Sequence, residues 1–342
     1  MVPATPITEE SIRPASLMRD KEAALESDVR YLLERRDQWV EAGCPSCGGR
    51  HRVLFGRKNG FSYQRCTACE TVFTSPRPSP KLLDAFYAQS ANYAYWNEHV
   101  FPATESTRRS RIFRPRAERL KAMLGDLGKQ PGTLLDVGAA FGTFCLEAMD
   151  TGLAAEAIAL EPTPGLAETC RRRALRVIES PLEHVRDERV ADIVTAFEVI
   201  EHVFDPEGFV RACARQLRPG GLLVLSCPNV KGFAIDELGV ASGSFDHEHL
   251  NYFHAASLRA LVNRCGLQTL ETLTPGELDV DIVRKAALSG DLDLAEQPMI
   301  RGVLLEDDEP RRAAFQRFLA ERGMSSHLWL VAEKTSDPTN AR

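Results

Sequence analysis

Two acids and two histidines form an unbroken titratable run, Asp246–His249, and Tyr252 follows three residues later. Histidine titrates near neutral pH, so it can take a proton from a substrate hydroxyl group or from an activated carbon. A neighbouring carboxylate can hold the imidazole in one tautomer and raise its basicity. These residue types favour acid–base chemistry in the loop that carries them.

Two other interpretations of this run stay open. His247 and His249, which flank Glu248, could bind a metal ion, but such a site needs a third ligand and none stands nearby in the sequence. The run could instead be a polar cap that satisfies backbone groups, with Ser257 capping a helix predicted over Leu258–Cys265. The suitability of histidine for proton transfer favours the catalytic interpretation.

A second group of chemically active residues is a pair of Cys-x-x-Cys knuckles. Eighteen residues separate the two knuckles, which consist of Cys44, Cys47, Cys66 and Cys69. This spacing is typical of a four-cysteine zinc site, and four thiolates close a tetrahedral zinc completely, so we expect a structural Zn²⁺. Arg52–Phe55 and Phe61–Tyr63 look like short strands of a zinc ribbon. Reduced core cysteines and a redox pair are the alternatives, and the doubled spacing favours zinc over both.

A third group surrounds a glycine turn within Thr133–Phe144, where an apolar run leads through the turn into a helix-compatible segment. An acid is followed there by small residues at every second position, namely Asp136, Gly138, Ala140 and Gly142. Glycine lets the backbone approach a ligand closely, and doubly wound sheets bind nucleotides at the carboxyl ends of their strands. The spacing differs from the dinucleotide pattern G-x-G-x-x-G. A carboxylate here would repel a pyrophosphate, but it suits a ligand with a cationic amine.

The next predicted strand, Ala157–Leu160, ends at Glu161, which lies 23 positions after Gly138. This offset is close to the ~20 positions expected for an acid that binds ribose hydroxyls. A helix-capping acid is the plain alternative, and the pairing with Asp136 makes the ribose role the better interpretation. Further strands are predicted at Arg176–Glu179 and Asp192–Phe197, so strands and helices alternate as in a parallel sheet.

This order of motifs resembles class I methyltransferases that use S-adenosylmethionine (SAM), over residues 133–230. The resemblance implies an α/β, Rossmann-like sheet of seven strands whose last strand, at His327–Ala332, is antiparallel. It also implies SAM as cofactor, held by Asp136, Gly138, Ala140, Gly142, Glu161, Pro162, Pro181, Leu182 and Glu198. Two departures stand out: Ala140 replaces a usual glycine, and no acid occupies the usual adenine-contacting position after the third strand.

The cysteine knuckles, the SAM motifs and the segment H-E-H-L-N-Y-F together look like the zinc-containing sugar C-methyltransferases. That resemblance implies His249 as the general base with Glu248 as its partner, and His202 as a second active-site histidine. Asp246 stands where that group has tyrosine, and Tyr252 is expected to hydrogen-bond the substrate. Only about seventy residues follow Leu270, whereas that group carries a large C-terminal domain, so the substrate is expected to differ.

The expected organisation has four parts: an N-terminal helical segment (1–41), a zinc ribbon (42–75), a linker with a helical lid (76–130), and a SAM domain (131–334) with a helical insertion at about 286–325. In the first part, the spacing of apolar residues predicts an amphipathic helix over Ser27–Val40. In the third, the clustered aromatic side chains are expected to form either a lid over the site or the seam between ribbon and core. These residues are Phe86, Tyr87, Tyr93 and Tyr95.

Composition narrows the function further. The formal net charge of −6 over 342 residues argues against a broad nucleic-acid surface. No apolar run approaches the roughly 18 residues of a membrane helix, and the first residues do not resemble a secretory signal, so we expect a cytoplasmic protein without a membrane partner. Nine cysteines in that setting favour metal binding or reduced thiols.

The predicted function is methyl transfer from SAM to a small hydroxylated molecule, such as a sugar, a nucleotide-sugar or a natural-product intermediate. One alternative is an RNA methyltransferase that binds RNA through basic ribbon residues, namely Arg50, Arg52, Arg57, Lys58 and Arg65. Another is a non-catalytic scaffold on a decayed methyltransferase core, an interpretation supported by Ala140 and by the missing adenine acid.

Overall fold

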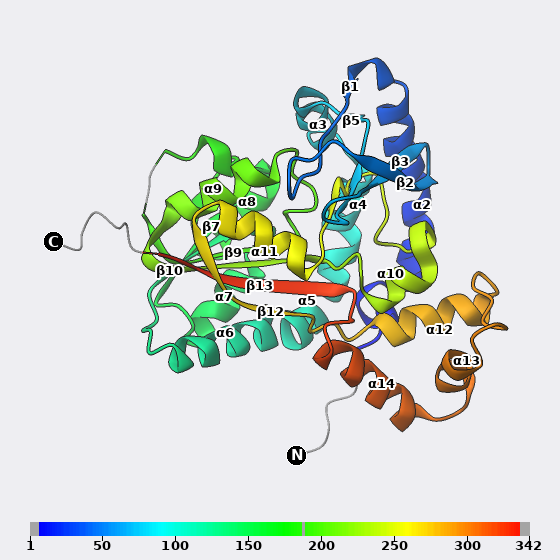
Figure 1. The fold of residues 1–342 in the computed structure, drawn as a ribbon. Coiled ribbons are helices and arrows are strands. Elements are labelled where there is room, and N and C mark those ends of the chain that lie inside the picture. Colours follow the sequence, from blue (N-terminus) through cyan, green and yellow to red (C-terminus); the bar gives the residue numbers. More distant parts are fainter. Residues whose placement is uncertain (1–6, 187–188, 336–342) are drawn as a thin grey trace.

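A seven-stranded sheet forms the centre of the computed structural model, which describes residues 7–186 and 189–335 (Figure 1). Its strand order is β12-β13-β10-β9-β6-β7-β8. The strands are β6 (Thr133–Val137), β7 (Glu156–Leu160), β8 (Arg176–Ile178), β9 (Ala191–Phe197), β10 (Leu217–Pro228), β12 (Leu267–Leu273) and β13 (His327–Lys334). β13 runs antiparallel to both of its neighbours. The predicted fold, including the reversed last strand, is confirmed.

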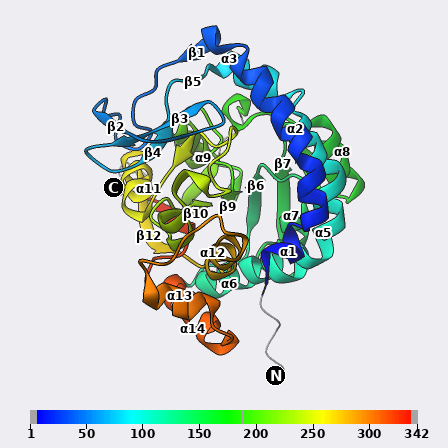
Figure 2. The same cartoon turned by 90° about the vertical axis from the view of Figure 1, so that its right-hand side faces the viewer.

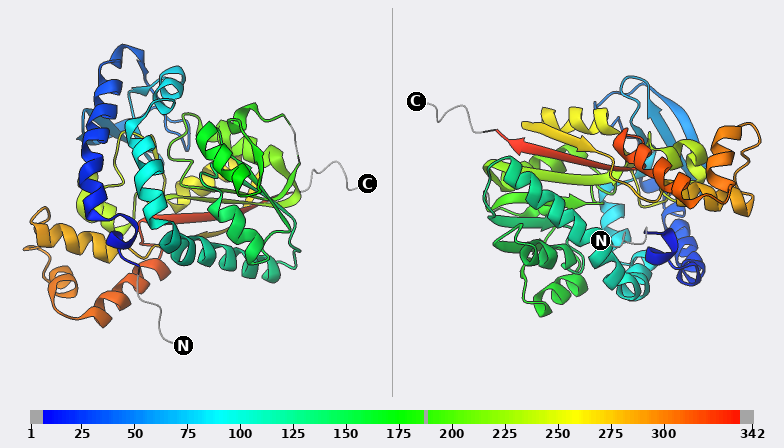
Figure 3. Two further views of the ribbon diagram at one scale, coloured as in Figure 1. Left: turned by 180° about the vertical axis from the view of Figure 1, so that it is seen from behind. Right: turned by 90° about the horizontal axis from the view of Figure 1, so that it is seen from below.

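Helices cover both faces of this sheet (Figure 3). Leu134 faces a core shared with α6 (Arg114–Asp126), α7 (Thr143–Asp150) and α8 (Pro164–Arg172). Its neighbour Leu135 points the opposite way, into a core shared with α9 (Pro206–Gln216) and α11 (Ala255–Arg264). A strand buried on both faces needs an apolar side chain at nearly every position, which explains the unbroken apolar runs in the sequence.

A second, smaller sheet of four strands carries the cysteine knuckles. β2 (Arg52–Lys58), β3 (Phe61–Cys66) and β4 (Val72–Thr74) form an antiparallel ribbon, and β11 (Asn251–Tyr252) adds a fourth strand beside β4. The ribbon strands predicted from the sequence are present and longer than expected. Because β11 comes from the loop that contains the titratable run, the ribbon is built directly onto that loop.

The N-terminal helix differs from its prediction. α1 (Glu9–Ile12) is followed by α2 (Ala15–Leu33), so the main helix begins and ends earlier than expected. After a 3₁₀ turn (Arg36–Gln38), β1 (Trp39–Val40) pairs with β5 (Arg77–Pro78). The apolar residues near position 40 that looked helical therefore belong to a short strand, because the proline-containing linker offers them an extended partner.

A long helical stretch leads from the ribbon to the central sheet. α3 (Pro80–Tyr87) is followed by α4 (Ala91–Tyr95), a π-helical turn (Trp96–Val100), α5 (Phe101–Arg108), a second π-helical turn (Arg109–Phe113) and then α6. Phe86 of α3 is buried in a cluster with ribbon residues such as Phe61 and Tyr63. This aromatic side chain therefore takes part in the expected seam.

The C-terminal insertion consists of α12 (Asp279–Ser289), α13 (Pro298–Leu305) and α14 (Glu309–Glu321). These helices pack with α10 (Phe233–Leu238) in a cluster of their own, at the lower right of Figure 1. Two further 3₁₀ turns span Leu182–His184 and Gly239–Ala241. Among the described residues, no helix combines the length and the apolar character that a bilayer crossing requires.

Candidate methyl-transfer site

The glycine turn between β6 and α7 has the backbone shape that its sequence predicts. Gly138 and Gly142 adopt φ values of 73° and 68°, and Ala140 lies between them at 49°. A Cβ added at Gly138 would lie 2.8 Å from a methyl group of Val199, and one added at Gly142 would lie 2.3 Å from a methyl group of Leu175, so these side chains would have to shift. The positive φ values are the stronger reason for glycine at both positions. Ala140 is a non-glycine residue in the left-handed region, which most side chains avoid.

Two buried acids flank this turn at the ends of adjacent strands. Asp136 is 4% exposed and accepts a hydrogen bond from Thr195 Oγ1 at 2.6 Å. Burial raises the pKa of Asp136 to about 7. Glu161 is 2% exposed and accepts from the backbone N–H groups of Ala140, at 2.8 Å, and Thr163, at 2.9 Å. Burial also raises the pKa of Glu161.

These bonds leave each acid able to accept more. A carboxylate has about four lone-pair positions, and Glu161 uses two of them on the backbone. A cationic amine near Asp136 would favour its charged form, and a pair of hydroxyls could fill the remaining positions on Glu161. The residues present therefore fit the adenosyl amino acid that the sequence predicts.

The other predicted cofactor residues differ in how far their side chains are exposed. Pro162 and Pro181 are exposed, but the Leu182 side chain is 3% exposed and packs into the core, so only its backbone can face a ligand. Glu198 directly follows β9 at a φ of 56° and accepts from Ser226 Oγ at 2.5 Å. The Glu198 side chain is 42% exposed, and although partial desolvation acts to raise its pKa, its contacts with His327, Arg116 and Ser226 lower that pKa overall.

Arg116 was not predicted from the sequence as a site residue. Its guanidinium lies 4.7 Å from the centre of the Phe197 ring, and it also faces Asp136 and Glu198 electrostatically. Its position within an arginine-rich helix gave no signal of this role, because such runs usually form a solvated face.

Hydrogen bonds between side chains and backbone groups of the same loop fix the conformation of the titratable run. Asp246 Oδ1 accepts from the N–H groups of Glu248 and His249, both at 2.9 Å. His249 Nδ1 lies 2.7 Å from the carbonyl oxygen of Ser244. A carbonyl oxygen can only accept, so His249 Nδ1 carries a hydrogen, and in the neutral ring the lone pair lies on Nε2.

This geometry corrects the expected partner of His249. The Glu248 carboxylate is bonded to the Asn92 side chain, and it lies 3.6 Å from His247 Nε2. The backbone carbonyl of Ser244, rather than the neighbouring acid, orients His249. The two side chains have separate partners, and sequence adjacency alone does not reveal this.

His202 completes a pair of imidazoles. The ring centres of His202 and His249 are 4.6 Å apart, and the rings are inclined at 77°. His202 Nδ1 lies 3.2 Å from the carbonyl oxygen of Glu248, so this imidazole also has a free Nε2. Burial lowers the pKa of His202 to about 3, which keeps that ring neutral. Two distant segments that were predicted separately are therefore brought together.

Glu201 was not predicted from the sequence as a site residue, although it directly precedes His202. Its side chain is fully buried, and neither carboxylate oxygen has a hydrogen-bond partner within 7–186 and 189–335. Burial raises the pKa of Glu201 well above its usual value. One oxygen of Glu201 and one nitrogen from each of His202 and His249 lie within 4.8 Å of one another. A metal site built from His247 and His249 together is not formed, because His247 faces Asp28 instead.

Tyr252 lies within the ribbon sheet. It is fully buried, its ring centre lies 4.3 Å from that of Phe245, and Tyr63 packs against its edge at 5.7 Å. Tyr252 belongs to β11, which pairs with the ribbon strand β4. Its hydroxyl has no hydrogen-bond partner among the described residues, so the contact with a substrate stays a prediction. The expected cap also differs: His254 precedes α11, and Ser257 Oγ accepts from its N–H at 3.0 Å.

The ribbon holds the loop that carries His249. Tyr63 donates its hydroxyl to the carbonyl of Asp246 at 3.0 Å, and Thr74 donates its hydroxyl to the carbonyl of His249 at 3.3 Å. His254 Nε2 lies 2.8 Å from the carbonyl oxygen of Cys69. One of the four cysteines is thus bonded directly to the segment after the titratable run.

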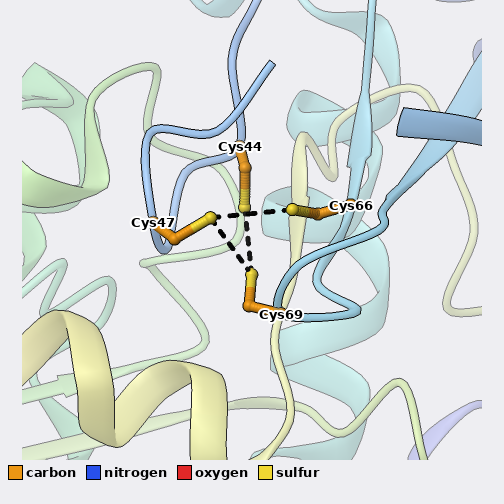
Figure 4. Close-up of side chains that lie close together, drawn as sticks. All are labelled: Cys44, Cys47, Cys66 and Cys69. Atoms are coloured by element: carbon orange, nitrogen blue, oxygen red, sulfur yellow. Dashed lines mark hydrogen bonds between the residues drawn. The ribbon is translucent and has the colours of Figure 1, made fainter. Parts of the chain in front are cut away.

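The four cysteines converge from two turns of the ribbon, as Figure 4 shows. Their Sγ atoms are separated by 3.4 Å (Cys44 to Cys69), 3.5 Å (Cys47 to Cys69) and 3.6 Å (Cys47 to Cys66). Ligand sulfurs of a tetrahedral zinc are about 3.8 Å apart when each Zn–S bond is about 2.3 Å. The arrangement fits such an ion and is too open for disulfides.

Comparison with known proteins shows the family of this chain. Residues 106–272 match a family model described as a methyltransferase domain. A ubiquinone biosynthesis O-methyltransferase of Xanthomonas axonopodis pv. citri (strain 306) is 32% identical over 170 residues, which are 45% of this chain and 68% of that protein. Matches to the same enzyme from other Xanthomonas strains span 62% of those proteins. The chain belongs to the SAM-dependent methyltransferases.

Solved structures with a similar outline are more distant. A chain in the complex of the Haloferax volcanii Trm112 methyltransferase activator with a methyltransferase has a TM-score of 0.49 and 17% identity, covering 72% of this chain and 96% of that one. The 1,6-didemethyltoxoflavin-N1-methyltransferase of Burkholderia thailandensis has a TM-score of 0.44 and 14% identity, covering 84% and 100%.

Proposed function

We propose that this chain transfers the methyl group of SAM to a small hydroxylated molecule, such as a sugar, a nucleotide-sugar or a natural-product intermediate. The observation that carries the proposal is the pair of imidazoles, His202 and His249, whose ring centres lie 4.6 Å apart and whose Nδ1 atoms each lie within hydrogen-bond distance of a backbone carbonyl oxygen. Bound SAM supplies an electrophilic methyl group on sulfur. The chain itself must align the acceptor with that group and remove one proton.

In this proposal the cofactor lies over the glycine turn. Gly138 and Gly142 let the backbone approach it, Asp136 binds its amine, and Glu161 accepts from its ribose hydroxyls. The remaining contacts with the cofactor are assigned to Ala140, Pro162, Pro181, the backbone of Leu182, and Glu198. Support comes from the burial of both acids and from their unused lone pairs.

His249 is the proposed general base. Its Nδ1–H group is fixed on the carbonyl of Ser244, so a proton from the acceptor would arrive at Nε2. His202 is the second candidate, but its lowered pKa, about 3, makes it a weaker base. Glu248 and His247 would act indirectly, by shaping the loop.

The ribbon is proposed to hold a structural Zn²⁺ on Cys44, Cys47, Cys66 and Cys69. Four thiolates would leave no open position for a substrate, so the ion would stabilise the ribbon and, through it, the loop that carries His249. We also retain the division into four parts (1–41, 42–75, 76–130 and 131–334) as a proposal.

The RNA-binding alternative has weaker support. Arg52 is paired with Glu41 and bonded to the carbonyl of Ala42, and Lys58 donates to the carbonyl of Ser242 at 2.9 Å. Two of the basic ribbon side chains are therefore engaged within the chain.

The base assignment is tested with purified protein, SAM carrying a radioactive methyl group, and a panel of acceptors: a hydroxylated aromatic, a free sugar and a nucleotide-sugar. With the acceptor that is methylated, His249→Ala is expected to bind SAM normally and to lose about 10²–10⁴-fold in turnover. His51→Ala, an exposed ribbon histidine, is the control. Normal turnover in His249→Ala would refute the base. A requirement for added Mg²⁺ would also refute it, because Glu201, His202 and His249 would then be ligands.

A further inference from the structure

The N-terminal helix α2 places one acid deep inside the molecule. Figure 2 shows α2 passing along one side of the structure, near α5. Most of its charged side chains are at least partly exposed, but Asp28 is only 4% exposed. A buried carboxylate needs hydrogen-bonded or charged partners to offset the loss of water, so its contacts indicate what it does.

Asp28 caps a different helix. Its carboxylate accepts from Ser90 Oγ at 2.5 Å, from the N–H of Ala91 at 2.9 Å and from the N–H of Asn92 at 3.0 Å. These groups lie at the start of α4, where helical N–H groups lack partners of their own. The acid of one helix therefore fixes the first turn of another.

The same carboxylate faces the titratable run. Asp28 Oδ2 lies 3.7 Å from His247 Nε2, and Glu248 Oε1 lies 3.6 Å from that nitrogen. Asn92 donates its side-chain amide to Glu248, so the capped helix also holds that acid. The His247 side chain is fully buried, and neither ring nitrogen has a hydrogen-bond partner in the described part of the chain. The groups that face it are Asp28, Asp246, Glu248 and the Phe86 ring.

A cation could in principle replace the proton between these side chains. Asp28 Oδ2 argues against it, because that oxygen already accepts from Ser90 and Asn92 and has no lone pair left for a metal bond. A protonated His247 between two acids fits the same geometry without a further bond, because charge pairing acts at 3.6–3.7 Å.

The contacts continue to the proposed active site. Glu248 offers its backbone carbonyl to His202 Nδ1 at 3.2 Å, and the next residue is His249. We propose that Asp28 is a positioning residue: by capping α4 and pairing with His247, it fixes the Asp246–His249 segment and thereby the imidazoles of His202 and His249. This inference rests on the proposed function of those two histidines. It also gives the N-terminal helix a part in the active site.

The test compares Asp28→Asn with Glu26→Gln, which removes one charge from an exposed position of the same helix. Asp28→Asn is expected to bind SAM within about twofold of the wild type, while kcat falls about 10–100-fold, because small displacements of catalytic groups cost that much. Glu26→Gln should leave both unchanged. If Asp28→Asn does not fold, Ser90→Ala keeps the Asp28 charge but removes the bond from Ser90 to Asp28 and the bond that Ser90 accepts from the N–H of Tyr93, and a smaller fall in kcat is expected.

A readout that does not depend on turnover separates this inference from the proposed function. Imidazole NMR of the wild type should show slowly exchanging Nδ1–H signals from His202 and His249, which Asp28→Asn broadens and Glu26→Gln preserves. If both signals and kcat survive in Asp28→Asn, the inference is wrong. It is also wrong if the wild type holds a second metal ion that Asp28→Asn loses. If the two signals broaden in Asp28→Asn and persist in Glu26→Gln, but the wild type transfers no methyl group, only the proposed function is refuted.

Discussion

Replacing Ala140 by glycine should stabilise the protein, which is unusual for a substitution beside a ligand site. Ala140 adopts a φ of 49°, in the left-handed region. That conformation costs an L-residue about 1–2 kcal/mol, which glycine avoids. Glycine loses more conformational freedom on folding, which costs about 0.5–1 kcal/mol. The difference leaves a gain of about 0.5–1 kcal/mol for Ala140→Gly.

The assay is thermal unfolding in parallel with calorimetric titration of SAM. A gain of this size should raise Tm by about 1–3 °C in a chain of this length. The N–H of Ala140 donates to Glu161 at 2.8 Å, and glycine keeps that group, so SAM should bind at least as tightly as to the wild type. Ala174→Gly is the matched control, because Ala174 is exposed at a φ of 60°. It should raise Tm similarly and leave SAM affinity unchanged.

A lower Tm for Ala140→Gly together with a higher Tm for Ala174→Gly would refute this reasoning. It would mean that the methyl group of Ala140 contributes more by packing than its backbone conformation costs. Weaker SAM binding in Ala140→Gly would contradict the placement of the cofactor over this turn.

Three further outcomes follow from the site. Below pH 7, SAM affinity should fall about tenfold per pH unit, because Asp136, whose pKa burial raises to about 7, must lose its proton to pair with the amine; calorimetry from pH 5.5 to 8 measures this, and a flat profile would contradict it. Metal analysis should find one zinc per chain, lost in Cys66→Ser but kept in Cys265→Ser, and a stable zinc-free wild type would rule out the zinc site. Tyr252→Phe should lower turnover and leave SAM binding unchanged, because the Tyr252 hydroxyl is buried without a partner among the described residues and is available to a substrate; full turnover would refute its substrate role.

The features that sequence predicted well are those that local chemistry determines. The strand that ends at Asp136 is covered on both faces, so its apolar run follows from burial alone. Gly138 and Gly142 are needed for their backbone angles, which no other residue adopts as easily. The spacing of the paired cysteines predicted the cluster of four Sγ atoms that the structure contains.

The features that sequence could not predict depend on contacts between distant segments. Glu248 and His249 are neighbours in the chain, but their side chains have different partners, and an irregular loop has no period from which this could be read. Tyr252 pairs with the ribbon strand β4, which is far away in the sequence, so no local pattern indicates this contact. The role of Asp28 could not be predicted, because a charged residue on a helix is usually solvated and only the fold shows that this one is buried.

The most direct test of the central claim is calorimetric titration of SAM into the wild type and into Asp136→Ala and Glu161→Ala. We predict one SAM site per wild-type chain, lost in Asp136→Ala and weakened at least about tenfold in Glu161→Ala, because a buried acceptor of ribose hydroxyls is removed. A wild type that binds no SAM, or an Asp136→Ala variant that binds it with undiminished affinity, would contradict the account.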